Sequence, residues 1–92
     1  MRITWNPNKA DANQRKHGVN LSEVEAVLHD PLSIITEDLS SIDEQRFLVL
    51  GVGDANRIYV VVYTYQENQI RLISARKASK AETKYYEKGI RF

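Results

Sequence analysis

Hydrophobic and polar positions divide this chain into a helical first third and a second part made largely of strands. Residues 2–5 are predicted to form a short strand, and Asn6 then caps a helix that opens with Pro7, whose φ is already helical. This helix is expected to run to about His17, because Gly18 suits the left-handed position that ends a helix. A second helix is predicted before Asp30-Pro31, where the apolar residues recur at helical spacing: Leu21, Val24, Val27 and Leu28.

From residue 33 the pattern changes to that of strands. Four are predicted, over residues 33–38, 46–52, 57–65 and 69–77, and residues 59–63 are apolar on both faces, as in a central strand covered on each side. Ser79 and Glu82 then form a capping box that opens the last helix. The order β-α-α-β-β-β-β-α predicts one α+β domain over residues 1–92, an antiparallel sheet with two N-terminal helices and one C-terminal helix.

Composition excludes several classes of protein. A chain of 92 residues without cysteine and with two histidines, His17 and His29, is expected to hold no disulfide, no metal and no cofactor. Walker, Rossmann, zincin and serine-elbow motifs are missing from the sequence. The longest apolar run, 58–63, is far shorter than the roughly 20 residues of a membrane helix, and residues 1–5 lack the apolar core of a signal peptide. We therefore expect a cytoplasmic protein that does not bind membranes.

The formal net charge of +1 hides a strong asymmetry along the chain. Residues 1–20 carry four cations and one acid, residues 21–56 one cation and eight acids, and residues 57–92 eight cations and three acids. The three net charges are thus +3, −7 and +5. Such polarity can orient a charged ligand, although a small domain can also be uneven in charge without any function.

The segment 70–78 ends a predicted strand with a cluster of cations that includes Arg71, Arg76 and Lys77. The planar fork of an arginine suits phosphate oxygens, so the segment suggests RNA or DNA as a ligand. Because side chains alternate along a strand, Arg71 and Arg76 are expected on opposite faces unless a bulge or a strong twist intervenes. The alternative is a structural role, in which one of the two arginines closes a sheet edge or forms a salt bridge with an acid such as Glu44.

Lys16 and His17 form a second candidate, at the end of the first helix. Histidine titrates near neutral pH and can act as an acid or a base, and a helix C-terminus favours its cationic form. The alternative is a histidine that only ends the helix. Among the aromatic residues, Trp5 and Tyr63 are expected in the core, whereas Tyr65 could stack on a base.

Together these residues resemble the BrnT family, the toxins of bacterial type II toxin-antitoxin pairs. The resemblance spans nearly the whole chain, and its specificity comes from two motifs at opposite ends, Lys16-His17-Gly18-Val19 and residues 73–78. The other matching residues are Trp5-Asn6-Pro7, Lys9, Ala10, Asn13, Asp30-Pro31, Glu44, Arg46, Gly51, residues 60–64, Glu82 and Tyr85 or Tyr86. Two departures are Asn6, where the family often has Asp, and Gln66, near which it tends to have an arginine.

The resemblance implies a RelE-like fold, ribonuclease activity that blocks translation, and neutralisation by a BrnA-type antitoxin. It also implies that operator DNA is bound only through the toxin-antitoxin complex. In metal-free cleavage the RNA 2′-hydroxyl attacks the phosphorus, cations hold the developing negative charge, and an acid and a base move protons. The candidate catalytic residues are His17, Lys16, Arg76 and Arg71, and the candidate RNA-binding residues are Lys9, Lys77, Arg46 and Tyr65.

Two other functions remain open at this point. The missing arginine near Gln66 allows a weak or inactive module that mainly binds an antitoxin and tunes its binding to operator DNA. The cationic segments also allow a nucleic-acid-binding domain that acts alone. Of the phosphate-binding candidates on the last strand, Arg76 and Lys77 are expected to face RNA, with Lys16 and His17 across from them.

Overall fold

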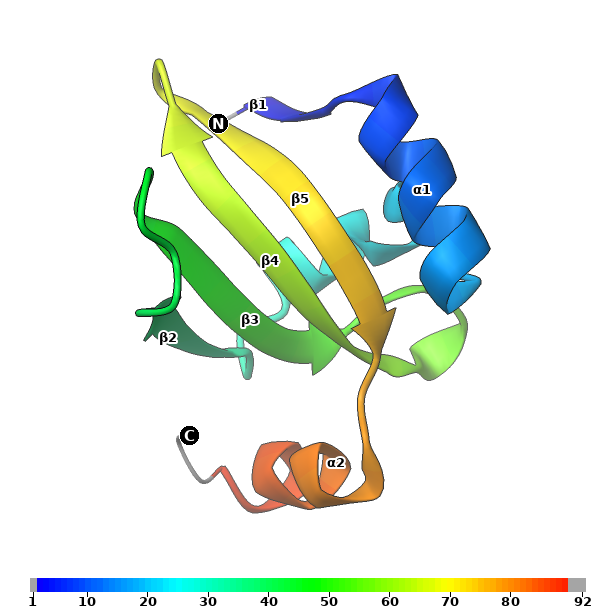
Figure 1. Ribbon diagram of the computed structural model, residues 1–92. Helices are drawn as coiled ribbons and strands as arrows, with labels where there is room; N and C mark the ends of the chain where they lie inside the picture. Colours follow the sequence, from blue (N-terminus) through cyan, green and yellow to red (C-terminus); the bar gives the residue numbers. More distant parts are fainter. Residues whose placement is uncertain (1, 90–92) are drawn as a thin grey trace.

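The computed structural model describes residues 2–89 and contains one five-stranded sheet with helices around it (Figure 1). The strands lie in the order β1-β5-β4-β3-β2. The elements are β1 (Arg2–Trp5), α1 (Pro7–His17), η1 (Leu21–His29), β2 (Ile34–Asp38), β3 (Arg46–Val52), η2 (Asp54–Asn56), β4 (Ile58–Gln66), β5 (Gln69–Lys77) and α2 (Lys80–Lys88). The predicted α+β class is confirmed, and the elements differ from the expected order by the 3₁₀ helix η1, where an α-helix was expected, and by the added short η2.

The capping signals in the sequence set the helix ends. The Asn6 side chain accepts a hydrogen bond from the Asn8 N–H at 2.8 Å, and Gly18 adopts a φ of 67° at the end of α1. Ser79 and Glu82 form both hydrogen bonds of the capping box that opens α2. These bonds satisfy N–H groups at the helix starts that have no partner within the helix.

The second helix is a 3₁₀ helix over its whole length, not the α-helix that is usual for nine residues. Leu21, Val24 and Val27 are spaced three residues apart and are all fully buried. Because a 3₁₀ helix has three residues per turn, this spacing aligns the three side chains in one row against the sheet. The apolar spacing therefore fits the tighter helix better than the expected one.

The sheet is mixed, so the expected antiparallel sheet is wrong at one edge. β1 runs parallel to β5, with Arg2 opposite Gln69 and Trp5 opposite Leu72. The other neighbouring strands are antiparallel. β1 pairs with the last strand of the sheet rather than with its successor in the chain, so no hairpin fixes its direction.

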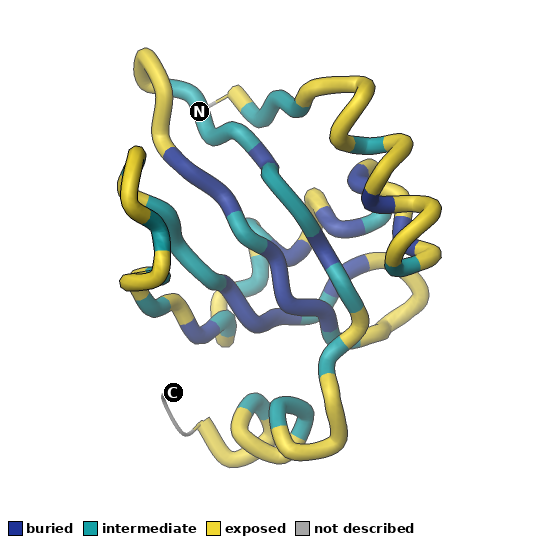
Figure 2. Tube along the Cα trace, in the orientation of Figure 1, coloured by how far each residue is buried: buried dark blue, intermediate teal, exposed yellow. Residues whose placement is uncertain are grey.

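The core consists of two clusters, one on each face of the sheet, and Figure 2 shows buried residues along β3, β4, β5 and η1. The larger cluster includes η1 and has these buried members: Val19, Leu21, Val24, Val27, Val49, Tyr59, Val61, Tyr63, Leu72 and Ala75. The smaller cluster, Ile34, Leu50 and Val60, contacts Tyr86 of α2. Tyr59, Val60 and Val61 of β4 are thus buried towards alternate faces, which confirms β4 as a central strand covered on both sides.

Asp30 connects η1, β3 and α2. Its carboxylate accepts hydrogen bonds from the Val52 N–H, the Leu32 N–H and the Tyr86 hydroxyl. Partial burial acts to raise the pKa of Asp30, but these three bonds outweigh it and hold the pKa below its usual value. The end of η1 and the C-terminal helix are therefore attached to the sheet through one carboxylate.

Candidate functional site

A groove of about 290 Å³ lies between α1 and β5. Its lining residues are Lys9, Ala12, Asn13, Lys16, His17, Ile73 and Ser74. The helix contributes three of the candidate residues, of which Lys9 and Lys16 are exposed and His17 is half-buried. Lys9 and Lys16 are seven residues apart, so their backbones lie about 10 Å apart along the helix axis. We call this cavity the α1–β5 groove.

Asn13 holds α1 against the edge of β5. It is 5% exposed, its amide nitrogen donates to the Val19 carbonyl at 2.8 Å, and its amide oxygen accepts from the Ala75 N–H at 2.9 Å. β1 pairs with β5 only as far as Leu72, so the helix continues the edge where β1 ends. From the sequence, Asn13 was notable only as a residue that matches the BrnT family, because α1 has too few apolar residues to reveal its inward face.

The α1–β5 groove is positively charged and its cations are available. Among residues 2–89 no carboxylate forms an ion pair with Lys9, Lys16 or His17. The last turn of α1 carries Arg15, Lys16 and His17, where the negative end of the helix dipole favours cations. An anion that enters the groove therefore meets Lys9 and Lys16 without first displacing a carboxylate from them.

A bulge in β5 changes the expected faces of the two arginines. Val62 of β4 lies opposite Ser74, but the next residue, Tyr63, lies opposite Leu72, so Ile73 is the extra residue. Arg71 and Arg76 face Thr64 and Val60, two residues of β4 that share a face because they are four positions apart. The two arginines therefore share a face, because the strand contains the bulge under which opposite faces were not expected.

Arg71 forms the structural salt bridge that was the alternative to RNA contact. Its guanidinium donates to both oxygens of Glu44, at 3.3 and 3.4 Å, and Arg46 contacts the same carboxylate at 3.2 Å. The Nε atom of Arg71 is buried and has no hydrogen-bond partner within the described chain. Two arginines thus share one acid, which leaves the cluster with a net positive charge.

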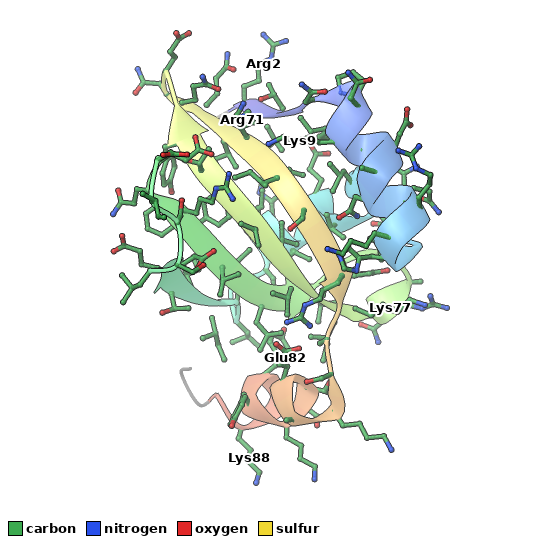
Figure 3. All side chains as sticks on the ribbon, in the orientation of Figure 1. Arg2, Lys9, Arg71, Lys77, Glu82 and Lys88 are labelled. Atoms are coloured by element: carbon green, nitrogen blue, oxygen red, sulfur yellow. The ribbon has the colours of Figure 1, made fainter. Side chains whose placement is uncertain are left out.

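Arg76 is also paired, with Glu82 of α2. Its two terminal nitrogens donate to the two carboxylate oxygens at 2.7 and 2.8 Å. Figure 3 shows Glu82 between α2 and the end of β5. The bonds from Arg76, together with those from Ser79, lower the pKa of Glu82 to about 2, although burial acts in the opposite direction. In this geometry Arg76 anchors α2 to the sheet.

The two remaining RNA-binding candidates lie elsewhere on the surface. Lys77 is exposed at the end of β5, where it lies opposite Tyr59 and thus on the other face from Arg76 (Figure 3). Tyr65 is 53% exposed and packs edge-on against Phe47 beside a second cavity of about 140 Å³. Ile73 and Ser74, rather than Arg76 and Lys77, are the β5 residues that line the α1–β5 groove.

The candidate residues therefore fall into separate groups. The α1–β5 groove unites Lys9, Lys16 and His17, Glu44 unites Arg46 and Arg71, and Arg76 joins Glu82. Trp5 and Tyr63 pack in the larger core cluster, as expected. Sequence reasoning missed Ser74 as a groove residue, and nothing in an alternating strand pattern would have indicated it.

Within residues 2–89 there is no group of three or more His, Asp or Glu side chains arranged to hold a metal ion. No helix in the same part of the chain has both the length and the apolarity that crossing a membrane requires.

The chain is similar to known toxins in sequence and in fold. Residues 5–82 match the family model described as "Ribonuclease toxin, BrnT, of type II toxin-antitoxin system". The 1.1 Å crystal structure of the Brucella abortus ribonuclease toxin BrnT matches with a TM-score of 0.63 and 24% sequence identity, over 87% of this chain and 99% of that chain. No curated protein sequence matches the chain. Because the family model covers most of the chain, as the motifs at its two ends had indicated, the protein belongs to the BrnT family of ribonuclease toxins of type II toxin-antitoxin systems.

Proposed function

We propose that this protein is a RelE-like ribonuclease toxin that cleaves RNA in the α1–β5 groove without a metal ion and thereby inhibits translation. The observation that carries the proposal is the groove itself, which brings together a half-buried histidine and two lysines that form no ion pair with a carboxylate of residues 2–89. An RNA backbone needs cationic contacts, and its cleavage needs a proton donor or acceptor, and the groove provides both. The cytoplasm, where mRNA is translated, is the expected site of action.

The chemistry needs only side chains that this groove contains. Lys9 and Lys16 hold the phosphate and neutralise the charge that develops when the 2′-hydroxyl attacks the phosphorus. His17 transfers a proton, either from that hydroxyl or to the leaving 5′-oxygen. Ser74 lines the opposite wall and offers a hydroxyl group to the phosphate. Each role follows from the chemistry of the side chain and its place in the groove.

The arginines have secondary roles in this proposal. Arg71 and Arg46 keep a net positive charge around Glu44, and they guide flanking phosphates along the face of the sheet that Arg71 shares with Ser74. Arg76 positions α2, and Lys77 and Tyr65 contact RNA beyond the scissile bond. A BrnA-type antitoxin neutralises the toxin, and operator DNA is bound only by the toxin-antitoxin complex.

The test is RNA cleavage by the purified chain in excess chelator, with and without ribosomes. We expect cleavage to persist in chelator and to leave 2′,3′-cyclic phosphate ends. His17→Gln should slow cleavage by about 10²–10⁴-fold, because that is the usual contribution of general acid-base catalysis. His29→Gln is the matched control, since His29 is exposed at the end of η1 and does not line the groove. Equal losses in both variants, or intact RNA with the wild type, would refute the proposal.

A second function is favoured by the ion pairs of the arginines. Arg46, Arg71 and Arg76 are all engaged by carboxylates, as expected of a chain that mainly binds an antitoxin and tunes operator binding. This function predicts a tight complex with the antitoxin and no growth arrest when the chain is expressed alone. Growth arrest on induction, rescued by the neighbouring gene, distinguishes the toxin from such a module.

A further inference from the structure

The sheet has two edges, and they differ in whether other parts of the chain cover their backbone N–H and C=O groups. On one side β1 and α1 follow β5, and Asn13 caps the backbone that β1 leaves open. On the other side β2 is the last strand, and within residues 2–89 it pairs with β3 alone (Figure 1). Unpaired N–H and C=O groups on an edge strand are a template for another strand.

Exposed apolar side chains are concentrated in the segment of the chain that contains this open edge. Six large hydrophobic residues of the described chain are exposed, and four of them lie in β2 or within four residues of its ends. The exposed fractions are 72% for Leu32, 47% for Ile35, 84% for Leu39 and 96% for Ile42. An exposed apolar cluster beside an unpaired strand marks a surface that binds a partner.

Charge decides which kind of partner fits. No Lys or Arg occurs from residue 18 to residue 45, whereas Glu37 of β2 and Asp43 of the following loop are exposed acids. Edge strands are often protected by lysine or proline, and β2 has neither. An acidic edge repels RNA and also repels a second copy of itself, so it fits a cationic polypeptide.

We propose that β2 is the docking edge for a cationic, extended segment of the antitoxin, which adds a sixth strand to the sheet. Main-chain hydrogen bonds to β2 would supply affinity, and apolar side chains of the segment would cover Ile35 and its neighbours. The inference rests on the proposed function for the existence of an antitoxin. It places the bound antitoxin on the edge of the sheet opposite the α1–β5 groove, so that both can be tested separately.

The first experiment is amide hydrogen exchange on the full chain, alone and in complex with the product of the neighbouring open reading frame. We expect exchange at residues 34–38 to slow by at least tenfold in the complex, because a new strand would pair their free amides. Unchanged exchange at β2 in a complex that forms would overturn the inference. It would leave the ribonuclease proposal intact.

The second experiment changes the β2 edge from apolar and acidic to cationic. The double variant Ile35→Lys, Glu37→Lys should bind the same protein about tenfold or more weakly, since like charges would then oppose the cationic segment. It should still arrest growth, because neither residue lines the α1–β5 groove, but the neighbouring gene should no longer rescue the cells. Glu87→Lys on α2 makes the same exchange of glutamate for lysine away from the edge, so it is the control for the Glu37 change and should be rescued normally.

The outcomes separate the two proposals. Normal rescue of the double variant would overturn the docking edge and keep the toxin. Failure of the neighbouring protein to bind the wild type would overturn both the docking edge and the assignment of that protein as antitoxin. A wild type that binds its neighbour with slowed exchange at β2 but never arrests growth would support the docking edge and refute the toxin.

Discussion

The ion pair between Arg76 and Glu82 should make the free energy of unfolding depend on pH. The pKa of Glu82 lies at about 2 in the folded chain, against an ordinary value of 4.5. At about 1.36 kcal/mol per pKa unit, that difference corresponds to at most ~3 kcal/mol of folding free energy. The Arg76 side chain is 44% exposed, so solvent screening reduces the expected contribution to ~1–2 kcal/mol.

The sign follows from the direction of the shift. Because the pKa of Glu82 is lower in the folded than in the unfolded chain, its contribution is complete above about pH 5. It is lost as the pH falls through 4.5 towards 2. Glu82→Gln should therefore lower the free energy of unfolding by ~1–2 kcal/mol at pH 7 and should cost nothing extra near pH 2. Glutamine can still accept the Ser79 N–H of the capping box, so the variant isolates the ion pair.

The assay is urea unfolding of wild type and Glu82→Gln between pH 2 and pH 7. Asp30 and Asp38 also have lowered pKa values, so the difference between the two proteins, not the wild-type curve alone, carries the result. We expect this difference to shrink as the pH falls from 5 to 2. A difference that stays constant over that range would show that the loss comes from packing or capping, and would refute the electrostatic explanation.

Three other changes have defined outcomes. Asn13→Ala should lower the free energy of unfolding by ~2–4 kcal/mol in urea, since it leaves the buried Ala75 N–H without its partner; a loss under 1 kcal/mol would contradict the role of Asn13 at the β5 edge. Tyr86→Phe should lower the free energy of unfolding by ~1–2 kcal/mol in the same measurement, because the hydrogen bond to the Asp30 carboxylate is lost. Tyr85→Phe is its control and should lower the free energy of unfolding by less. Gly53→Ala should cost ~1–3 kcal/mol, as a Cβ there would lie 2.9 Å from the Tyr59 ring; calorimetry that finds an unchanged Tm would contradict this.

Local signals in the sequence were enough to predict most element boundaries. Asn6, Gly18 and Ser79 act through hydrogen bonds or backbone angles within a few residues, and the structure has helix ends at these positions. The apolar run of β4 likewise predicted a central strand. The direction of β1 could not be predicted in this way, because it depends on pairing with a strand more than 60 residues later in the chain.

The candidate site was predictable in part for the same reason. Lys16 and His17 lie on one helix end, and helical spacing places Lys9 on the same side, so local geometry brings them together. The partners of the arginines were harder to predict. Arg71 contacts Glu44, which lies 27 positions away in sequence. A structural salt bridge was only one predicted alternative for the arginines, beside contact with phosphate.

The bulge at Ile73 shows most clearly how packing overrides alternation. Leu72 and Ala75 are three residues apart, and both are buried in the larger core cluster, which a regular strand cannot achieve because odd spacings alternate between faces. One extra residue between them resolves the conflict. Without this residue Arg71 and Arg76 would lie on opposite faces; with it they lie opposite Thr64 and Val60 on one face. Ser74 lies opposite Val62, between these two residues of β4, so it shares that face and also lines the α1–β5 groove. A single irregularity in β5, selected by core packing, therefore brings both arginines onto the face on which Ser74 meets the lysine and histidine groove.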